Sequence, residues 1–123
     1  LARTILNFGI FTENFLIKKD QIFKKRDHRN GLAKQQLNLW REALLKIKKI
    51  CNEDIESTAI KFVNSYKFVS SLIIGIQNKS EFKKNLKILN QKALKKNQIK
   101  NILLVNKKNY FNKNLKPKNL LGN

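Results

Sequence analysis

The sequence has few of the residues that build disulfide frameworks, metal sites and sharp turns. It contains one cysteine, one histidine, one proline, four glycines and no methionine among 123 residues. A single cysteine excludes an internal disulfide, and a single histidine excludes a histidine-based metal cluster. We therefore predict no metal site, and we expect Cys51 to be a small hydrophobic core residue.

Long apolar runs are also missing. The longest, residues 69–76, contains two serines and is far shorter than the roughly 18–20 residues that a membrane helix needs. No segment has the charged start, apolar run and small-residue cleavage site of a secretory signal. Together with the lone cysteine, which suits a reducing compartment, these absences predict a soluble, cytoplasmic protein with no membrane partner.

Acidic residues are scarce against a large excess of basic ones. Lysine and arginine number 27 and aspartate and glutamate 8, for a formal net charge of +19. Such an excess is typical of proteins that bind nucleic acid. Lysine far outnumbers arginine, however, although the arginine fork is better suited to phosphate and base recognition. Lysine, asparagine and isoleucine also have A/T-rich codons, so genome composition can supply much of the charge. A basic nucleic-acid- or ribosome-associated protein is thus the alternative function, not the favoured one.

Helical periodicity is clear in the middle of the chain. One apolar stripe consists of Leu37, Trp40, Leu44, Ile47 and Ile50, with lysines on the opposite face. We expect this first helix to end at Asn52.

A second helix should follow directly. Asp54 is its expected N-cap, with Glu56 in its first turn. The buried stripe predicted for it consists of Ala59, Phe62, Val63 and Tyr66.

Two segments are typical of buried strands. Residues 1–12 (LARTILNFGIFT) and 69–75 (VSSLIIG) are rich in apolar and β-branched residues. A helix followed at once by a buried strand indicates α/β architecture. Between the first strand and the first helix, residues 13–34 predict a surface loop. Its expected anchors are Phe15, Leu16, Ile22 and Phe23.

The C-terminal part predicts two more helices and a tail. Asn78, with Glu81 three residues later, resembles the start of a capped helix. The core face predicted for that helix consists of Phe82, Leu86 and Leu89. Residues 92–105 predict a further helix through Leu94, Ile99, Ile102 and Leu103, and residues 107–123 a basic, Asn- and Lys-rich tail outside the domain of residues 1–106.

Two places are candidates for chemistry. Asp27 and His28 are adjacent in a polar loop, where local ion pairing is a better interpretation than part of a catalytic triad. Gly75 ends a predicted strand and precedes a capped helix, an arrangement that offers backbone N–H groups to an anion. A plain turn that requires glycine explains the same pattern equally well.

Four segments, in order, resemble the aldo/keto reductase family. Residues 69–86 (VSSLIIGIQNKSEFKKNL) resemble its last barrel strand and helix, with the pattern VxSxIxGxRxxxQxxxNL. Residues 56–68 resemble the helix before that strand. Residues 2–12 (ARTILNFGIFT) resemble the seventh strand and its loop, and residues 23–29 (FKKRDHR) a loop that reads FxxDHR.

The resemblance implies the C-terminal portion of a (β/α)8 TIM barrel, that is, its seventh and eighth strands plus C-terminal helices. It implies an oxidoreductase that reduces carbonyls or oxidises alcohols with NADP, or with NAD as the alternative. The cofactor contacts it implies fall in two groups. Near the nicotinamide and pyrophosphate they are Arg3, Thr4, Leu6 and Gly9, and around the adenosine they are Gly75, Gln77, Asn78, Glu81 and Asn85.

The departures from the family pattern matter as much as the match. Gln77 stands where an arginine usually pairs the 2′-phosphate, and Glu81 stands where glutamine is common. This exchange weakens the preference for NADP unless Lys79 or Lys83 substitutes. No member of the catalytic Asp, Tyr, Lys and His set maps onto the chain, so no catalytic residue is predicted. We expect the chain to need the missing N-terminal barrel half as a partner and to be inactive alone.

Overall fold

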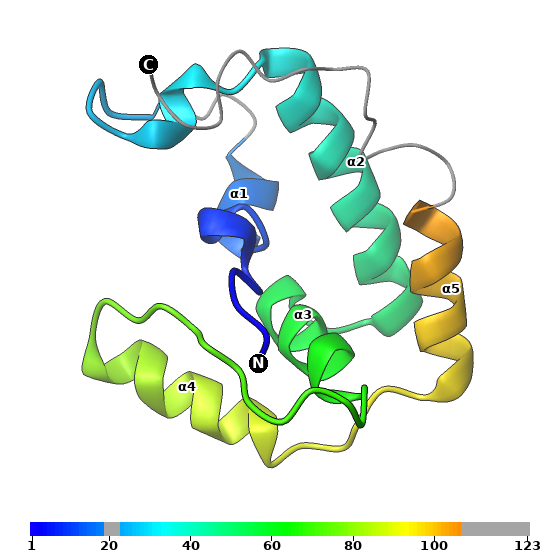
Figure 1. The fold of residues 1–123 in the computed structure, drawn as a ribbon. Helices are drawn as coiled ribbons and strands as arrows, with labels where there is room; N and C mark the ends of the chain where they lie inside the picture. Colours follow the sequence, from blue (N-terminus) through cyan, green and yellow to red (C-terminus); the bar gives the residue numbers. More distant parts are fainter. Residues whose placement is uncertain (19–22, 107–123) are drawn as a thin grey trace.

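The computed structural model describes residues 1–18 and 23–106, and helices dominate these residues (Figure 1). The two short 3-10 helices are η1 (Asn7–Gly9) and η2 (His28–Gly31). The α-helices are α1 (Glu13–Ile17), α2 (Lys34–Cys51), α3 (Ile55–Asn64), α4 (Lys79–Leu89) and α5 (Lys96–Asn106).

The described residues form no β-sheet, so the expected portion of a TIM barrel is wrong. The two predicted strands meet only at one isolated parallel bridge between Ala2 and Leu72. Around it, the N–H of Ala2 donates to the carbonyl of Ser71 at 2.8 Å, and the N–H of Ile73 donates to the carbonyl of Ala2 at 2.8 Å. Two short extended segments with no further strand beside them cannot build a ladder, although their composition favours one.

The N-terminal segment turns instead of continuing as a strand. Residues 4–9 fold into a tight turn that contains η1, and α1 follows with Thr12 as its N-cap. The predicted loop of residues 13–34 therefore contains α1 and η2. Three of its expected anchors are buried, namely Phe15, Leu16 and Phe23; Ile22 lies outside the described residues.

The first predicted helix is confirmed as α2, with a start three residues earlier than its apolar stripe. Leu44 and Ile47 of that stripe are buried, and the other members pack against the same core. Asn52 ends the helix in a left-handed conformation (φ 54°), which asparagine tolerates better than most residues. Cys51 is buried, as expected for a core residue.

Local capping signals are confirmed, and the predicted buried face of α3 is correct in part. The side chain of Asp54 accepts the N–H of Ser57 at the start of α3, and that of Asn78 accepts the N–H of Glu81 at the start of α4. The fully buried residues of α3 are Ile55, Ser57, Thr58 and Ile60. Ala59, Phe62 and Val63 of the predicted stripe are partly buried and pack against the core, whereas Tyr66 lies beyond the end of the helix.

The predicted core face of α4 is wrong for a physical reason. Ile88 is its buried residue, whereas Phe82, Leu86 and Leu89 are 40–47% exposed. The helix packs on α3 and, through Ile88, on the N-terminal turn, so one side is covered and these three apolar side chains on the other are left partly exposed. Helix α5 begins at Lys96, later than expected.

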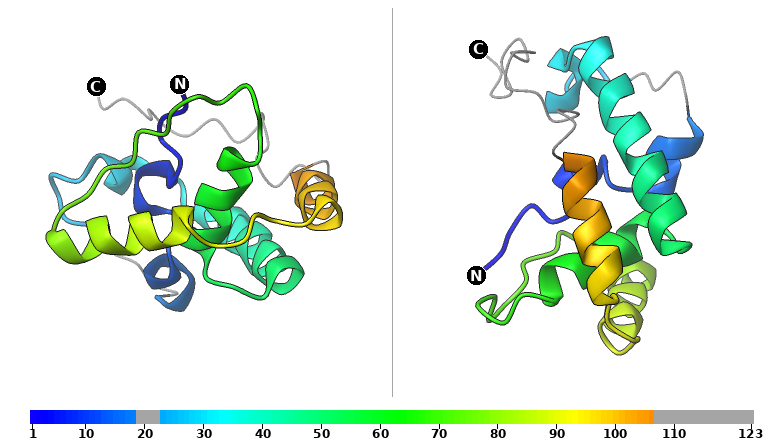
Figure 2. Two further views of the ribbon diagram at one scale, coloured as in Figure 1. Left: turned by 90° about the horizontal axis from the view of Figure 1, so that it is seen from below. Right: turned by 90° about the vertical axis from the view of Figure 1, so that its right-hand side faces the viewer.

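The core is divided into two clusters. The larger one lies around α2, which packs against both α1 and α5; Figures 1 and 2 show α1 on one side of α2 and α5 on the other. The smaller one joins the N-terminal turn, α3 and α4 through Ile5, Ile60 and Ile88. This smaller cluster places the start of α4 opposite the turn of residues 4–9. None of the helices in the described part of the chain is both long and apolar enough to cross a membrane.

Candidate functional site

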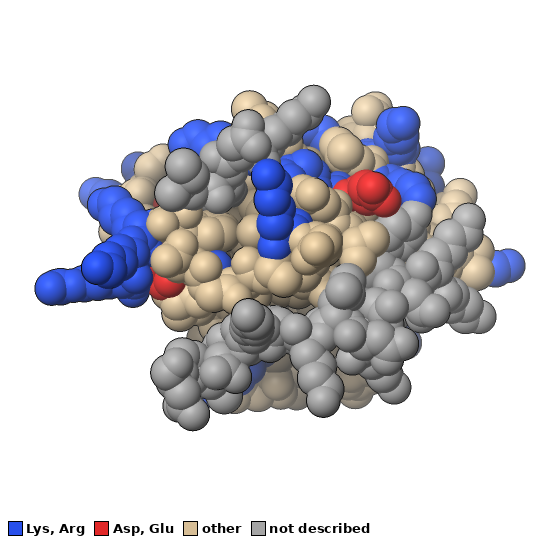
Figure 3. Space-filling view, turned by 90° about the horizontal axis from the view of Figure 1, so that it is seen from above, with Lys and Arg blue, Asp and Glu red and all other residues tan. Residues whose placement is uncertain are grey.

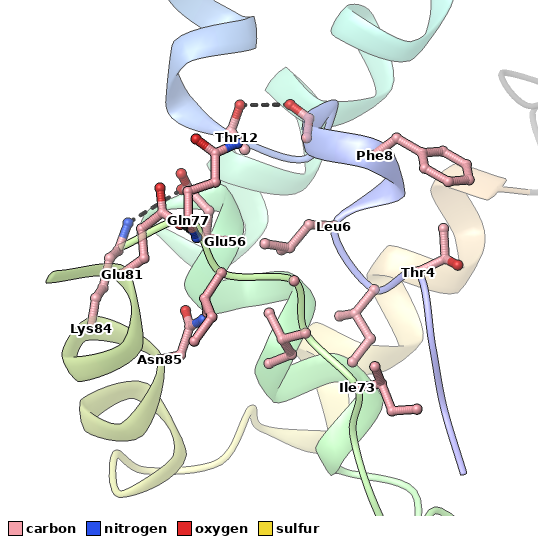
Figure 4. A pocket seen from close by; sticks show the side chains of 15 residues that line it. Thr4, Leu6, Phe8, Thr12, Glu56, Ile73, Gln77, Glu81, Lys84 and Asn85 are labelled. Carbon is pink, nitrogen blue, oxygen red and sulfur yellow. Dashed lines mark hydrogen bonds and ion pairs between the residues drawn. The ribbon is translucent and has the colours of Figure 1, made fainter. Parts of the chain in front are cut away.

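A cavity of about 440 Å³ lies between the N-terminal turn and the segment that leads into α4 (Figure 4). Its walls come from parts of the chain some seventy residues apart in sequence, held together by the smaller core cluster. It is lined by Thr4, Ile5, Leu6, Phe8, Gly9, Thr12, Glu56, Ile73, Ile74, Gly75, Ile76, Gln77, Glu81, Lys84 and Asn85.

The N-terminal wall has an unusual backbone. Thr4 (φ 61°), Asn7 (φ 44°), Phe8 (φ 54°) and Gly9 (φ 81°) all occupy the left-handed region. For a β-branched threonine this conformation is rare and costs about 1–2 kcal/mol. Strained residues of this kind cluster at binding sites, where the surrounding structure holds them.

Hydrogen bonds lock this turn against α1. The hydroxyl of Thr12 donates to the carbonyl of Gly9 at 2.9 Å, while its oxygen accepts the N–H of Phe15 as the helix cap. The N–H of Phe11 donates to the carbonyl of Leu6 at 3.1 Å. The wall of the cavity is therefore a fixed surface.

The opposite wall is the start of α4. The Asn78 side chain accepts the N–H of Glu81 at 3.0 Å, and the Glu81 carboxylate reaches back to the N–H of Gln77 at 2.8 Å. The N–H groups of Lys79 and Ser80 belong to the first turn of the helix, where no intrahelical partner exists. These two groups point out of the helix end as donors, but the Glu81 charge already compensates its positive dipole.

Charged side chains gather at one end of the cavity in Figure 4. Lys84 lies 3.7 Å from Oε2 of Glu56 and 3.8 Å from Oδ1 of Asp54. That Oε2 atom is buried without a hydrogen-bond partner in the described structure, so the Lys84 ammonium is its main compensation. The side-chain amides of Gln77 and Asn85 make no hydrogen bond within residues 1–18 and 23–106, and both remain available to a ligand.

Gly75 leaves open space in the cavity wall. Its φ is not in the left-handed region, and a Cβ added to it would meet no heavy atom within 4 Å. The turn therefore does not require glycine for its own backbone. The absence of a side chain instead lets a ligand approach the chain closely at this point.

The comparison with protein families shows to which family the chain belongs. A model described as "Aldo/keto reductase family" matches residues 1–107. The chain belongs to the aldo/keto reductase family. No curated protein and no solved structure matches it.

Membership of the aldo/keto reductases brings an oxidoreductase function and a nicotinamide cofactor as properties of the family. Most of the residues that the resemblance implies for cofactor contact line the cavity. They are Thr4, Leu6, Gly9, Gly75, Gln77, Glu81 and Asn85.

Two of the implied residues lie elsewhere. Arg3 is exposed and does not line the cavity. Asn78 caps α4 and lines a neighbouring shallow hollow with Ile76, Gln77, Lys79 and Phe82. Among the polar and charged residues of the lining, sequence reasoning missed Thr12, Glu56 and Lys84, because they carry only helix-cap and surface-charge signals.

The Asp27–His28 pair takes no part in the cavity. The Asp27 carboxylate binds the Arg29 guanidinium at 2.9 and 2.6 Å, which confirms a loop held by a local ion pair. Its hydrogen bond with Arg29 lowers the pKa of Asp27 to about 2. His28 packs its ring edge-on against Phe8, with centroids 5.0 Å apart, and so supports the cavity wall from outside.

Basic side chains outnumber acidic ones on the face of this aldo/keto reductase drawn in Figure 3. They lie in separate groups, the most prominent at its left edge, around a centre that is mostly neither basic nor acidic. No group of three or more His, Cys, Asp or Glu side chains in the described residues is arranged to hold a metal ion.

Proposed function

We propose that the cavity between the N-terminal turn and α4 binds the nicotinamide dinucleotide of an aldo/keto reductase. The observation that carries the proposal is the meeting of Thr4 and Gly9 with Gly75 and Asn85 around one cavity. A volume of about 440 Å³ is within the usual range for cofactor sites of roughly 300–1,000 Å³. The space beside Gly75 fits the close approach of a nucleotide.

The chemistry of the lining and of the helix start beside it fits a dinucleotide in a definite direction. The unpaired amide of Asn85, in the lining, suits the donor and acceptor edge of adenine. The N–H groups of Lys79 and Ser80 lie outside the lining, in the first turn of α4, and suit a phosphate. The turn with Thr4 and Leu6 would then face the pyrophosphate and nicotinamide. When bound, the cofactor supplies or accepts the hydride.

The residues of this cavity are less suited to the 2′-phosphate of NADP than the residues that the family pattern has at the same positions. Glu81 places a negative charge at the start of α4, and Lys84 is already paired with Glu56. Lys79, in the neighbouring hollow, and Lys83, exposed on α4, are the two candidate cations named for a 2′-phosphate, and of the two Lys79 lies nearer the start of the helix. We propose that NADP binds through Lys79 and that its advantage over NAD is small.

The proton donor for the reaction is proposed to come from a part of the enzyme outside these 123 residues. No residue of this chain is assigned a catalytic role. The apolar groups that a companion segment would cover lie beside the cavity, at Ile73 and Ile76 and along α4 at Phe82, Leu86 and Leu89; each is 40–52% exposed. The chain alone would therefore bind cofactor without turning over substrate.

Titration of the full chain with NADPH and NADH, followed by cofactor fluorescence, tests the proposal. Asn85→Ala should weaken both cofactors about tenfold, as expected for a lost hydrogen-bonding amide. Asn101→Ala is the matched control, because Asn101 is exposed on α5 away from the cavity. Equal affinities for the two variants would contradict the assignment.

Two further variants separate the cavity from the fold. Gly75→Ala should leave the melting temperature unchanged, since a Cβ at this position meets no heavy atom within 4 Å, whereas the larger Gly75→Val should block binding. Glu81→Gln should tighten NADPH more than NADH, because it removes a charge next to the proposed phosphate position. NADPH binding by Gly75→Val with unchanged affinity would contradict the proposal that the cofactor binds beside Gly75.

The net charge of +19 supports nucleic-acid binding as a second candidate. That function predicts an RNA affinity that falls steeply with salt as counterions are released. RNA binding without any cofactor binding would favour it over the oxidoreductase assignment.

A further inference from the structure

Positive charge is concentrated in the C-terminal third of the chain. All eight acidic residues precede Phe82, whereas twelve of the 27 basic residues follow it. A/T-rich codons can raise the lysine content of a protein, but they act on the whole chain alike. They do not explain why the acidic residues stop at Glu81. A charge asymmetry of this kind indicates a surface that meets a polyanion.

Five of these lysines follow one another along one edge of the described structure. They belong to the end of α4, the connection to α5 and the first turns of α5, and this connection runs along the lower edge of the molecule in Figure 1. We call this surface the basic edge; it consists of Lys87, Lys92, Lys95, Lys96 and Lys100. All five residues are exposed, and none forms an ion pair within residues 1–18 and 23–106.

The acidic side chain that is linked to this stretch through a hydroxyl group is already paired. Ser57 donates a hydrogen bond to Oε2 of Glu53 at 3.0 Å, and its hydroxyl oxygen lies 3.4 Å from Oε1 of Gln91, in the connection between α4 and α5. The Glu53 carboxylate pairs with the ammonium of Lys61. In the described part of the chain, therefore, no carboxylate offsets the charge of the basic edge.

Two of these lysines are unfavourable for the helix beside them. Lys95 directly precedes α5, Lys96 is its first residue, and the first turn contains no acidic residue. Cations at this end of a helix are repelled by the positive end of its dipole. Helix stability therefore gives no reason for their position, whereas a bound anion would remove the repulsion.

The exposed side chains between the lysines indicate which anionic partner fits. In residues 90–101 they are asparagine, glutamine and one alanine, while Leu94 is buried and Ile99 packs against the core. A helix that binds a membrane surface needs large apolar side chains beside its lysines, and this stretch exposes none. Ammonium and amide groups instead donate hydrogen bonds to the phosphate and sugar oxygens of nucleic acids.

We propose that the basic edge binds the phosphate backbone of a nucleic-acid strand without reading its base sequence. Lysine contacts phosphate as a point charge, whereas the arginine fork that base recognition favours is absent from the sequence after Arg41. None of the five lysines lines the cofactor cavity, so the two ligands occupy different surfaces of the chain. The proposal does not depend on the cofactor assignment.

The experiment is a titration of a fluorescently labelled single strand of about 20 uridine ribonucleotides with the full chain, followed by anisotropy at several salt concentrations. Five phosphate contacts predict that log affinity falls with log salt with a slope of about −3.5 or steeper, because counterions are released on binding. No saturable binding, or a slope near zero, would overturn the proposal.

Neutralisation of the centre of the basic edge locates the site. A triple variant with Lys92→Gln, Lys95→Gln and Lys96→Gln should weaken RNA binding at least about tenfold and make the slope shallower by about 2. Its melting temperature should not fall, because the change removes cations from the start of α5. Arginine at the same three positions should preserve binding, since it keeps the charge, and loss of binding there would contradict a backbone contact.

A matched triple variant separates the basic edge from the net charge. It neutralises three exposed lysines at the upper end of the molecule in Figure 1, in the loop before α2 and at the first residue of that helix: Lys24→Gln, Lys25→Gln and Lys34→Gln. Its net charge equals that of the first variant, but it should weaken RNA binding less than about threefold, because distant exposed charges are screened.

Two outcomes of this comparison would overturn the proposal. Equal weakening by the two triple variants would mean that the charge of the chain as a whole attracts RNA. Binding of the full chain to vesicles that contain phosphatidylserine, without binding to RNA, would assign the basic edge to a membrane surface instead.

Discussion

The Nη1 atom of Arg29 donates a hydrogen bond to the backbone carbonyl of Phe8, 2.8 Å away. The same guanidinium binds both carboxylate oxygens of Asp27 and lies over the ring of Phe23, 4.6 Å from its centroid. One side chain thus joins the loop of residues 23–29 to the strained turn that forms a wall of the cofactor cavity. We infer that this hydrogen bond from the loop stabilises the conformation of the turn.

Removal of the Arg29 guanidinium should destabilise the folded protein. Arg29→Ala breaks a bidentate, charge-assisted pair and one bond to the turn, for an expected loss of about 1–3 kcal/mol in the free energy of unfolding. Arg26→Ala, at an exposed arginine three residues away, should change it by less than about 0.5 kcal/mol. Urea unfolding of the two variants measures the difference in their free energies of unfolding. Equal midpoints would show that Arg29 does not stabilise the contact between the loop and the turn.

The same pair predicts a pH dependence. The pKa of Asp27 is held at about 2 in the folded chain, below its ordinary value, mainly by the hydrogen bond with Arg29. Its contribution is therefore complete above about pH 4–5 and is lost as the pH falls towards 2. Because the pair is partly exposed and screened, we expect about 1 kcal/mol.

Unfolding of the wild type and of Asp27→Asn, compared between pH 2 and 7, measures this contribution. The free energies of unfolding of the two proteins should differ at pH 7 and become equal near pH 2. Parallel curves across the whole range would mean that the carboxylate contributes no net stability through its charge.

Glu13 should be a second stabilising centre. Its Oε1 atom accepts the N–H of Ile55 at 3.0 Å and its Oε2 atom pairs with Lys48, so one carboxylate joins α1 to α2 and α3. Glu13→Ala should cost about 1–3 kcal/mol, since it leaves the N–H at the start of α3 unpaired. Glu42→Ala, exposed on α2, is the control with an expected change below about 0.5 kcal/mol. Thermal unfolding of both variants tests this, and similar losses would count against it.

Cys51 should react slowly with thiol reagents. Burial raises the pKa of its thiol, so little thiolate is present at neutral pH. A disulfide reagent should modify the native chain many times more slowly than the urea-unfolded chain. Rates within about twofold of each other would mean that the α2 terminus opens readily.

Signals that act within a few residues made the helices predictable. Asp54 and Asn78 bind the N–H groups three residues on, as their place before an apolar-periodic segment indicates. The stripe of α2 is also correct, because its one apolar side faces a continuous core.

Long-range partners were not predictable in the same way. Residues 69–75 have the composition of a strand, but composition does not supply a neighbouring strand, and one bridge to Ala2 is all that forms. Phe82 and Leu86 have helical spacing, yet nothing in the described chain covers them. Most of the cofactor contacts implied by the resemblance do line the cavity. Glu56 and Lys84 line it as well, but only because α3 packs on α4, which the sequence does not indicate.

A nicotinamide cofactor site in this cavity can be located by mapping backbone amide shifts as NADPH is added to the ¹⁵N-labelled full chain. We expect saturable shifts concentrated at Thr4 and Gly9 in the turn and at Gly75, Lys79 and Asn85 around α4, with α5 unaffected. Shifts absent from these residues, or centred on another part of the chain, would contradict a nicotinamide cofactor site in this cavity.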